Sequence, residues 1–324
     1  MIITPKELNK WISQKISLKI IDVRSENQRK EFPIVHLETD IAEYDNLPKT
    51  KGKSVLVCQF GIITENIILE KKLKNTYSLL GGVQAWDMFQ SERKDYSRWS
   101  RQTVLPEIGI VGQKKILNAN IAIIGMGGLG CPAAQSLVAS GIGRIKIIDG
   151  DNIELSNLHR QTLYGKKDIG NLKVDVAKNK LQYINPDTII DKKPYFINKK
   201  NISSLLVDTD IIIDATDNIE ARLIIDDYSK KSRKPMIYGG LYRYEGQVAV
   251  LNYKGSIGYK ELFPQDFSES NNCEEAGVLG MLPGIIGNMQ ALEALKLVLR
   301  IDKNLIGKLL IYDSMSHQTK TINL

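Results

Sequence analysis

The stretch "IAIIGMGGLGCPAAQ", residues 121–135, leads from an apolar run through a glycine-rich turn into small residues that suit a helix. An uninterrupted apolar run of this length is typical of a strand in a parallel sheet that is covered on both faces. Glycine permits a tight turn and a close approach of the backbone to a phosphate, and the N–H groups that begin a helix attract anions. The stretch therefore predicts a strand–turn–helix unit of the dinucleotide-binding type, with its turn formed by Gly125, Gly127, Gly128 and Gly130.

Strand and helix patterns alternate around this unit, which predicts right-handed crossovers and a Rossmann-like, doubly wound and mostly parallel sheet. After Gly246 the runs "GQVAVLNY" and "KLLIYDSMSHQTKTINL" predict antiparallel strands on the C-terminal side. A long irregular segment at 254–277 precedes a predicted helix at about 284–300. The other expected strands are 120–125, 144–149, 193–197, 210–214 and 235–239, and the other expected helices are 128–140, 171–184, 201–207 and 219–232.

The N-terminal part of the chain also alternates between strand and helix patterns, and it predicts a separate α/β domain. The polar stretch "QSERKDYSRWSR", residues 90–101, is interpreted as the linker into the second domain. We therefore expect one domain over 1–92 and a second over 93–324.

The composition is that of a soluble globular protein, with 43% hydrophobic and 25% charged residues. The net charge is +7, but the lysines are scattered, so we expect a solvated basic surface rather than a nucleic-acid site. The only cysteines are Cys58, Cys131 and Cys273, which form no disulfide framework and favour a reducing compartment. No apolar run is long enough for a membrane span or a signal peptide, and we expect a cytoplasmic protein.

Charged and amide side chains follow the glycine turn. Asp149 ends the apolar run "RIKIID", where a ribose partner is expected, and Asn157, Arg160 and Lys173 come soon after it. Two cations and an amide suit a triphosphate better than a nicotinamide, because breaking a polyphosphate bond requires charge neutralisation. The residues therefore favour a nucleoside triphosphate in this cradle.

A second acidic segment follows the buried run "IIID". Asp214 ends this run, Asp217 lies just past it, and Arg222 lies on the helix expected next. A carboxylate at the end of a strand can hold magnesium through its oxygens. Asp217 can equally well cap the helix that follows. The residues alone leave both roles open.

Several stretches of the second domain carry a resemblance to a known family. In order, they read "RWSRQTVLPEIG", "GMGGLG", "DGDNIELSNLHRQ", "GNLKVDVA", "ATDNIEAR" and "CEEAGVLGMLPGIIGNMQALEALK". Over about residues 96–324 the set resembles the ThiF/MoeB/HesA family, bacterial relatives of the ubiquitin-activating enzymes. The resemblance implies a homodimeric adenylyltransferase that uses ATP and magnesium. Its substrate would be the C-terminal glycine of a small ubiquitin-like sulfur carrier protein, ThiS- or MoaD-like, in thiamine or molybdenum-cofactor biosynthesis.

The resemblance also implies a role for each matching position. The glycines of the turn would border the phosphates, and one arginine would reach the ATP of the neighbouring subunit. The remaining implied roles are Asp149 at the ribose, Asn157, Arg160 and Lys173 at the triphosphate, Asp217 at magnesium, Arg222 in support of the Asp217 region, and Arg101 at the neighbour's ATP.

Many members of that family hold a structural zinc ion with two CxxC pairs. The position of the first pair falls near "GSIGYKELFP", residues 255–264, which contains no cysteine. Cysteines as far apart as the three in this chain do not make a tetrahedral zinc site. We expect no zinc.

Cys273 and Cys131 have different expected roles. In ThiF-like relatives the cysteine that matches Cys273 can take part in sulfur transfer or bond covalently to the carrier. A buried structural thiol is the alternative for Cys273. Cys131, on the first helix, is expected to pack in the core.

The first domain resembles a rhodanese-like domain in "IIDVRSENQRKEF", "CQFGIIT" and "LLGGVQAW". Cys58, Gly61 and Thr64 keep a C-x-x-G-x-x-T spacing, although Ile63 stands where an arginine is frequent. In rhodaneses this loop stabilises a persulfide with backbone N–H groups. The resemblance implies that Cys58 takes sulfur from a persulfide donor such as a cysteine desulfurase. An inactive docking module is the alternative.

The leading hypothesis joins the two domains in one sequence of reactions. The carboxylate of the carrier attacks the α-phosphate of ATP, and a persulfide sulfur then displaces AMP to give a thiocarboxylate. One rival is an NAD-dependent oxidoreductase, which gives Arg160, Lys173 and Asp217 no joint role. The other rival is a non-catalytic scaffold that binds a carrier protein.

Overall fold

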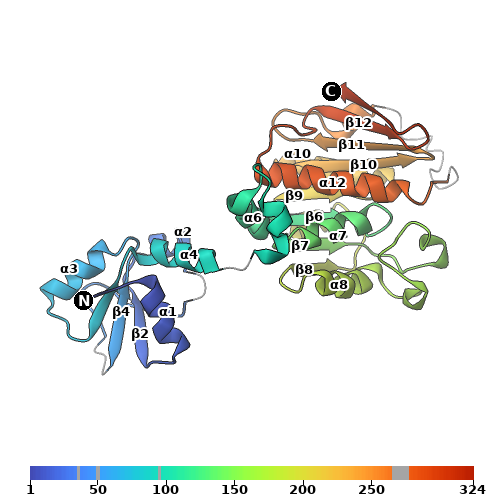
Figure 1. The fold of residues 1–324 in the computed structure, drawn as a ribbon. Helices are drawn as coiled ribbons and strands as arrows, with labels where there is room; N and C mark the ends of the chain where they lie inside the picture. The colour runs from blue at the N-terminus through green and yellow to red at the C-terminus, as the bar shows by residue number, and fades with distance from the viewer. Residues whose placement is uncertain (35–36, 49–51, 94–95, 265–276) are drawn as a thin grey trace. The chain divides into compact units, whose positions relative to one another are not determined.

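The computed structural model describes residues 1–34, 37–48, 52–93, 96–264 and 277–324. The chain divides into two compact units, Met1–Arg98 and Trp99–Leu324 (Figure 1). Each unit has its own sheet and its own hydrophobic core. Within the described ranges, no helix is both long enough and apolar enough to cross a membrane.

The first unit is built on a five-stranded parallel sheet in the order β1-β5-β4-β2-β3. Both faces of the sheet are covered, because Leu8 and Trp86 pack on one side and Ile67 and Ile68 on the other. The elements are β1 (Ile2–Ile3), α1 (Pro5–Ser13), β2 (Leu18–Asp22), α2 (Glu26–Glu31), β3 (Asp40–Ile41), β4 (Lys53–Val57), α3 (Ile62–Glu70), β5 (Thr76–Leu79) and α4 (Gly82–Arg93).

The second unit has an eight-stranded sheet in the order β13-β12-β11-β10-β9-β6-β7-β8. Strands from β8 to β10 run parallel, and β11, β12 and β13 continue the sheet antiparallel. The strands are β6 (Asn120–Ile124), β7 (Arg144–Ile148), β8 (Ile189–Lys193), β9 (Ile211–Asp214), β10 (Met236–Tyr242), β11 (Glu245–Leu251), β12 (Lys308–Asp313) and β13 (Gln318–Asn323). The helices are α5 (Ser100–Thr103), α6 (Gly109–Asn118), α7 (Gly130–Ala139), α8 (Lys173–Ile184), α9 (Ile202–Leu206), α10 (Ile219–Ser232), α11 (Tyr259–Leu262) and α12 (Leu282–Leu299), with short 3₁₀ turns at Ser97–Trp99, Leu155–Asn157 and Lys166–Asp168.

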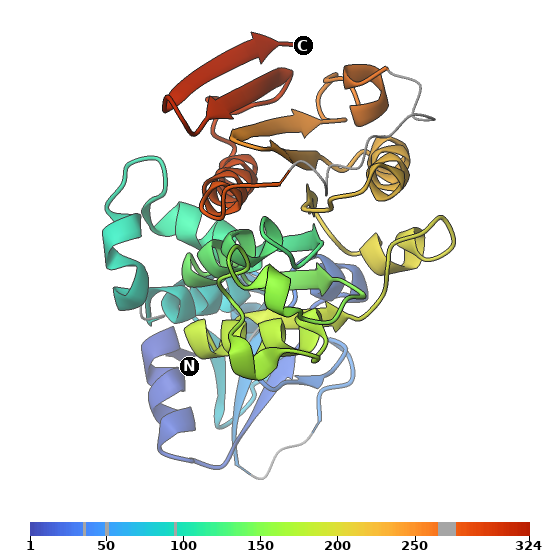
Figure 2. The ribbon, with the colours of Figure 1, turned by 90° about the vertical axis from the view of Figure 1, so that its right-hand side faces the viewer.

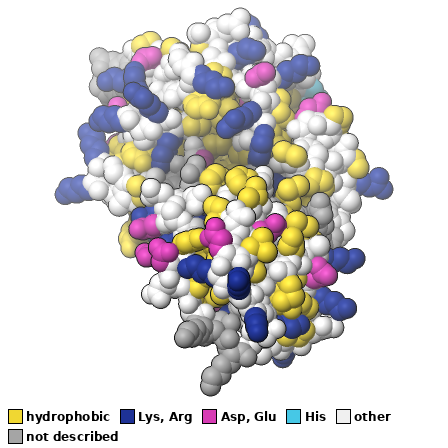
Figure 3. All heavy atoms as spheres, turned by 90° about the vertical axis from the view of Figure 1, so that its left-hand side faces the viewer, with side chains coloured by type: hydrophobic (Ala, Val, Ile, Leu, Met, Phe, Trp, Pro, Cys, Tyr) yellow, Lys and Arg dark blue, Asp and Glu magenta, His cyan; other side chains and the backbone are white. Residues whose placement is uncertain are grey.

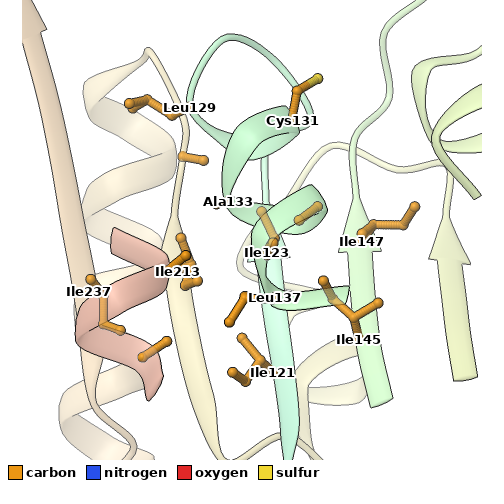
Figure 4. Close-up of a cluster of buried hydrophobic side chains, with 14 of the residues drawn as sticks. Ile121, Ile123, Leu129, Cys131, Ala133, Leu137, Ile145, Ile147, Ile213 and Ile237 are labelled. Carbon is orange, nitrogen blue, oxygen red and sulfur yellow. The ribbon is translucent and has the colours of Figure 1, made fainter. Parts of the chain in front are cut away.

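Helices cover both faces of this sheet, with α12 on one side and α10 on the other (Figure 2). Alternate residues of one strand therefore enter different cores: Ile121 and Ile123 pack with Leu137 of α7 (Figure 4), whereas Ala122 and Ile124 pack on the opposite face. This two-sided burial explains why β6 is a continuous apolar run rather than an alternating one.

On the outer surface, lysines and arginines are spread over the face in Figure 3, with aspartates and glutamates between them.

Three details differ from the sequence-based expectations. The strand expected at 193–197 lies at Ile189–Lys193, because Pro194 ends it and because an edge strand with polar residues lacks a long apolar run. The expected linker at 90–101 is partly helical, since α4 continues to Arg93 and α5 begins at Ser100. The segment expected to be irregular at 254–277 contains the short helix α11, and residues 265–276 lie outside the described part of the chain.

Candidate functional site

The glycine turn lies where the order of the strands reverses. From β6 the chain moves outward through β7 to β8, and then returns to the other side of β6 at β9. The turn after β6 and the turn after β9 are neighbours at the carboxyl edge of the sheet, since Ala215 N–H donates to the Ile124 carbonyl at 2.9 Å. Ligands of open α/β sheets bind at such a reversal.

Two of the glycines are required by close contacts. Gly125 has a φ of +93°, and a Cβ at this position would lie 2.5 Å from the Ala215 carbonyl oxygen. A Cβ on Gly130 would lie 1.9 Å from the Gly125 carbonyl oxygen. These two positions therefore require glycine. The turn brings the first N–H groups of α7 to the carboxyl edge of the sheet.

Asp149 directly follows β7, and its carboxylate is hydrogen-bonded to the glycine turn. Its carboxylate accepts the Met126 N–H at 2.7 Å and the Asp151 N–H at 2.8 Å. Burial raises the pKa of Asp149, while the charge of Lys173 and the two N–H donors oppose that rise. Each carboxylate oxygen retains a free lone pair, so Asp149 can still accept a hydrogen bond from a hydroxyl.

The predicted cations and amide lie on the segment that leaves β7. The Lys173 ammonium is buried and lies 2.8 Å from the Asp151 carboxylate. Arg160 is half-buried, and its guanidinium donates to the Ser156 carbonyl at 2.9 Å. The Asn157 side chain accepts the Glu154 N–H at 3.2 Å, so part of its bonding capacity stabilises its own turn.

Asp217 is exposed on the turn after β9. Among the described residues, its carboxylate has no hydrogen-bond or ion-pair partner. The interpretation of Asp217 as a helix cap is wrong, because the cap of α10 is Asn218, whose side chain accepts the Ala221 N–H at 2.8 Å. The carboxylate of Asp217 is therefore available to a ligand.

Arg222 is hydrogen-bonded to the backbone next to the turn that carries Asp217. Its guanidinium donates to the Thr216 carbonyl at 2.8 Å and to the Gly239 carbonyl at 3.2 Å. The Nε atom lies 3.6 Å from Oδ2 of Asp214, a fully buried carboxylate at the end of β9. Arg222 thus contacts the backbone of β10 and of the turn that carries Asp217.

Sequence reasoning placed Asp214 at the end of the strand, where an aspartate can hold magnesium, and gave no role to Gln290. Gln290, on α12, is fully buried and donates from Nε2 to the Asp214 carbonyl at 2.7 Å and to the Ile237 carbonyl at 3.1 Å. Gln290 therefore connects α12 to β9 and β10, close to the turn that carries Asp217. A polar residue flanked by Met289 and Ala291 in the mostly apolar run "GIIGNMQALEAL" was the signal that could have indicated this contact.

Arg101 lies on α5 and is exposed, with no partner among the residues that the structure describes. Cys131 is buried on α7, as expected, and burial raises the pKa of its thiol to about 12. Cys273 lies outside the described residues. No group of three or more histidine, cysteine or acidic side chains in the described part of the chain is arranged to hold a metal ion.

Cys58 follows β4 in the first unit and opens the loop into α3. Its sulfur accepts the Gly61 N–H at 3.1 Å and lies 3.6 Å from the Thr64 hydroxyl. A Cβ on Gly82 would lie 2.1 Å from the Cys58 carbonyl oxygen. The backbone after β5 therefore packs closely against the Cys58 loop. Of the ring of N–H donors expected around the sulfur, one donor, Gly61, contacts it in the described loop, and the sulfur is buried.

The residues at the sheet edge fit a nucleoside triphosphate with magnesium. The glycine turn brings the first N–H groups of α7 to this edge, Lys173 and Arg160 supply positive charge, and Asp149 retains acceptor capacity. Asp217 offers one unpartnered carboxylate, and magnesium bound with ATP usually needs only one or two of them. Together the fold and this edge define a nucleotide-binding α/β domain of the Rossmann type.

The sequence model of the ThiF family matches residues 99–324, and the chain belongs to this family. The "Sulfur carrier protein adenylyltransferase" of Thermus thermophilus is 39% identical over 69% of this chain and 85% of its own length. The "Adenylyltransferase and sulfurtransferase MOCS3" of Culex quinquefasciatus is 37% identical over 89% of this chain and 62% of its own length. The "Probable molybdopterin-synthase adenylyltransferase" of Porphyra purpurea is 42% identical over 69% of this chain and 59% of its own length. All three are named adenylyltransferases, and the chain spans less than two thirds of the latter two.

Solved structures show the same fold. PaaA, in its selenomethionine form, matches with a TM-score of 0.61 and 27% identity, over 71% of this chain and 74% of that protein. MccB of E. coli, solved with ATP, matches with a TM-score of 0.62 and 21% identity, over 74% of this chain and 78% of that protein. The second likeness concerns the fold alone.

Proposed function

We propose that this protein adenylates the C-terminal glycine of a small ubiquitin-like sulfur carrier protein, with ATP as the nucleotide. The observation that carries the proposal is the meeting of the glycine turn, Lys173, Arg160 and the free Asp217 carboxylate at one sheet edge. Membership of the ThiF family and the name of the Thermus relative support the choice of substrate.

In this reaction a carboxylate oxygen of the carrier attacks the α-phosphorus of ATP, and the bond to the bridging oxygen breaks as pyrophosphate leaves. The N–H groups of the glycine turn and of α7 hold the phosphates. Lys173 and Arg160 neutralise the charge that develops on pyrophosphate. Asp149 accepts a hydrogen bond from the ribose. Magnesium, held by Asp217, supplies further charge neutralisation when bound.

A homodimer with shared sites is part of the proposal, with Arg101 reaching the nucleotide of the second subunit. Four exposed apolar side chains lie close to Arg101 in sequence, on and between α5 and α6. These are Val104, Leu105, Ile110 and Val111. An exposed cluster of this kind is typical of a protein contact. Sedimentation that gives a fully active monomer would contradict this part of the proposal.

The first unit is proposed to be a rhodanese-like sulfurtransferase domain. Cys58 takes a sulfur atom from a protein persulfide and becomes a persulfide itself. Its terminal sulfur attacks the acyl carbon of the carrier adenylate and AMP leaves, which gives an acyl disulfide. A thiol then reduces this disulfide, and the carrier leaves as a thiocarboxylate. The N–H contact from Gly61 supports a polarised sulfur at Cys58.

The carrier is proposed to serve thiamine or molybdenum-cofactor biosynthesis. The name of the Porphyra relative supports the molybdenum branch. Residue roles in the second unit are independent of this choice, because both kinds of carrier present a C-terminal glycine. Zinc is expected to be absent, on the ground that the chain contains no CxxC pair.

The deciding experiment uses candidate carriers of both pathways. Each is incubated with the protein, ATP and magnesium, and pyrophosphate exchange into ATP is measured. Intact mass spectrometry of the carrier, after addition of a persulfide donor and a thiol, then shows whether a thiocarboxylate forms. A carrier that binds without exchange would favour a scaffold, and a rise in melting temperature with NAD but not ATP would favour an oxidoreductase.

A further inference from the structure

Thr216, the residue before Asp217, is held from both sides of its backbone. Its N–H and its hydroxyl donate to Oδ1 of Asp214 at 3.0 Å and 2.6 Å. Its carbonyl accepts a hydrogen bond from Nη2 of Arg222 at 2.8 Å. The peptide units on either side of Thr216 are therefore fixed by two side chains of opposite charge.

The two clamping side chains form a buried ion pair. The Asp214 side chain has no exposed area, and Arg222 Nε lies 3.6 Å from Asp214 Oδ2 without forming a hydrogen bond. The Arg222 guanidinium also lies over the rings of Tyr238 and Tyr259, at 5.2 Å and 5.8 Å from their centroids. A buried pair of this kind costs desolvation energy, and it is weak evidence of a purely stabilising role.

The Asp214 and Arg222 side chains form a clamp around Thr216. This clamp acts on Asp217, the residue that follows Thr216. The Asp217 carboxylate itself has no partner in the described part of the chain, so its direction depends on the backbone of Thr216. Asn218 begins the capping of α10 immediately afterwards, which limits the freedom of the turn on the other side. The fixed backbone on both sides sets the direction of the Cα–Cβ bond of Asp217 and so limits the positions that its carboxylate can reach.

We propose that Asp214 and Arg222 are positioning residues that clamp Thr216 and thereby aim the Asp217 carboxylate at the magnesium of bound MgATP. The inference rests on the proposed function, which assigns Asp217 to that metal. It gives Arg222 a supporting role without direct contact to the nucleotide, because this guanidinium is engaged by Thr216, Gly239 and Asp214. The clamp therefore governs metal affinity and leaves the affinity for the metal-free nucleotide unchanged.

The test is Asp214→Asn in the full chain. Asparagine keeps an oxygen for the Thr216 N–H and removes the charge that faces Arg222. Manganese is the probe, and its free concentration is followed by electron paramagnetic resonance in the presence of a non-hydrolysable ATP analogue. We expect the affinity for Mn²⁺ to fall by about tenfold, which corresponds to roughly 1.4 kcal/mol. The affinity for the analogue in EDTA should be unchanged. Asp217→Ala gives the reference for complete loss of the metal contact.

Two further variants keep the inference testable. Thr216→Val removes only the hydroxyl contact with Asp214, and it is expected to weaken Mn²⁺ binding in the same direction if Asp214→Asn does not fold. Glu293→Gln, a buried carboxylate on α12 that accepts the Leu305 N–H at 2.8 Å, is the control, and it should leave Mn²⁺ binding unchanged. Folded variants of Asp214 and Thr216 with wild-type Mn²⁺ affinity would overturn the clamp. A wild-type protein that binds no manganese with the analogue would instead contradict the proposed function.

Discussion

The ammonium of Lys173 lies 2.8 Å from the carboxylate of Asp151, at the edge where the glycine turn presents its N–H groups. The Lys173 side chain is 8% exposed, whereas that of Asp151 is 52% exposed. The backbone of Asp151 also donates to Asp149, so one short segment connects the lysine with the proposed ribose acceptor. This arrangement holds a buried cation in place while it leaves two of its three protons for a phosphate.

Removal of the cation is expected to affect chemistry more than folding. Lys173→Ala should lower pyrophosphate exchange by about 100-fold or more, as removal of one charge-stabilising donor does elsewhere. Asp151→Asn keeps the cation and loses a half-exposed pair worth at most about 1 kcal/mol, so exchange should remain within about fivefold of wild type. Equal losses of exchange in the two variants would mean that the Lys173–Asp151 ion pair, rather than the positive charge of Lys173 alone, is required for the reaction.

Asp217 and Asn218 are neighbours with opposite expected effects. Asp217→Ala should abolish exchange, because the carboxylate is proposed to hold magnesium, while stability stays within about 0.5 kcal/mol, as for other surface changes. Asn218→Ala removes the α10 cap and should cost about 1 kcal/mol of stability, with exchange largely retained. Urea denaturation and the exchange assay on both variants measure the four quantities. Near-normal exchange in Asp217→Ala would remove the magnesium assignment.

Two glycines of the second unit differ in what surrounds them. A Cβ at Gly130 would lie 1.9 Å from a backbone oxygen, whereas a Cβ at Gly284 meets nothing within 4 Å. Gly130→Ala should therefore destabilise the unit by about 3 kcal/mol, the usual upper range for overpacking. Gly284→Ala on α12 should be neutral or stabilising by up to about 1 kcal/mol. Chemical denaturation of both variants checks the contrast, and equal stabilities would contradict the tight turn.

The glycine turn and its flanking elements were predictable because their signals are local. Four apolar residues before the turn and small residues after it specify β6 and α7 almost without reference to the rest of the chain. The helix expected at 219–232 has those bounds in the structure, because its first turn and its end carry strong local signals. The edge strand β8 was misplaced, since a strand that is half-exposed depends on its neighbour for pairing rather than on an apolar run.

The clamp below the site was not predictable in the same way. Asp214 and Arg222 are separated by the turn and the first residues of α10, and Gln290 lies 76 positions from Asp214 in the chain. Their contacts exist only once β9, α10 and α12 have packed. A sequence marks such residues only as polar side chains in apolar surroundings, which indicates burial but not the partner.

The Cys131 thiol should be inert in the folded protein. Burial disfavours the thiolate and raises the pKa of the thiol to about 12, so the neutral form prevails at pH 8 and remains dominant until the pH approaches that value. Iodoacetamide at pH 8, followed by peptide mass mapping, should leave Cys131 unmodified unless denaturant is present. Rapid alkylation of Cys131 in the native protein would contradict the burial of this side chain.

The last prediction is that Cys58, rather than Cys273, is the entry point for sulfur. Cys58 follows the buried strand β4, and its sulfur accepts the Gly61 N–H at 3.1 Å in a loop held by the hydroxyls of Thr64 and Ser78, both of which donate to the Gly61 carbonyl. A donor N–H stabilises a thiolate or persulfide without a nearby cation, which matters because Ile63 occupies the place of the frequent arginine. The sulfur is buried, so the loop must open when a protein donor loads it.

Loading from a protein persulfide donor, followed by mass spectrometric mapping, should therefore place the extra sulfur on Cys58 first. Cys58→Ala should lose this modification and slow thiocarboxylate formation by about 100-fold, while pyrophosphate exchange continues because it needs only the second unit. Cys131→Ala is the matched control, since it removes another buried thiol and should load as the wild type does. Cys273→Ala should still accept sulfur at Cys58, whether or not Cys273 acts later at the adenylate. If Cys58→Ala makes thiocarboxylate at the wild-type rate, the first unit is a docking module and sulfur enters elsewhere.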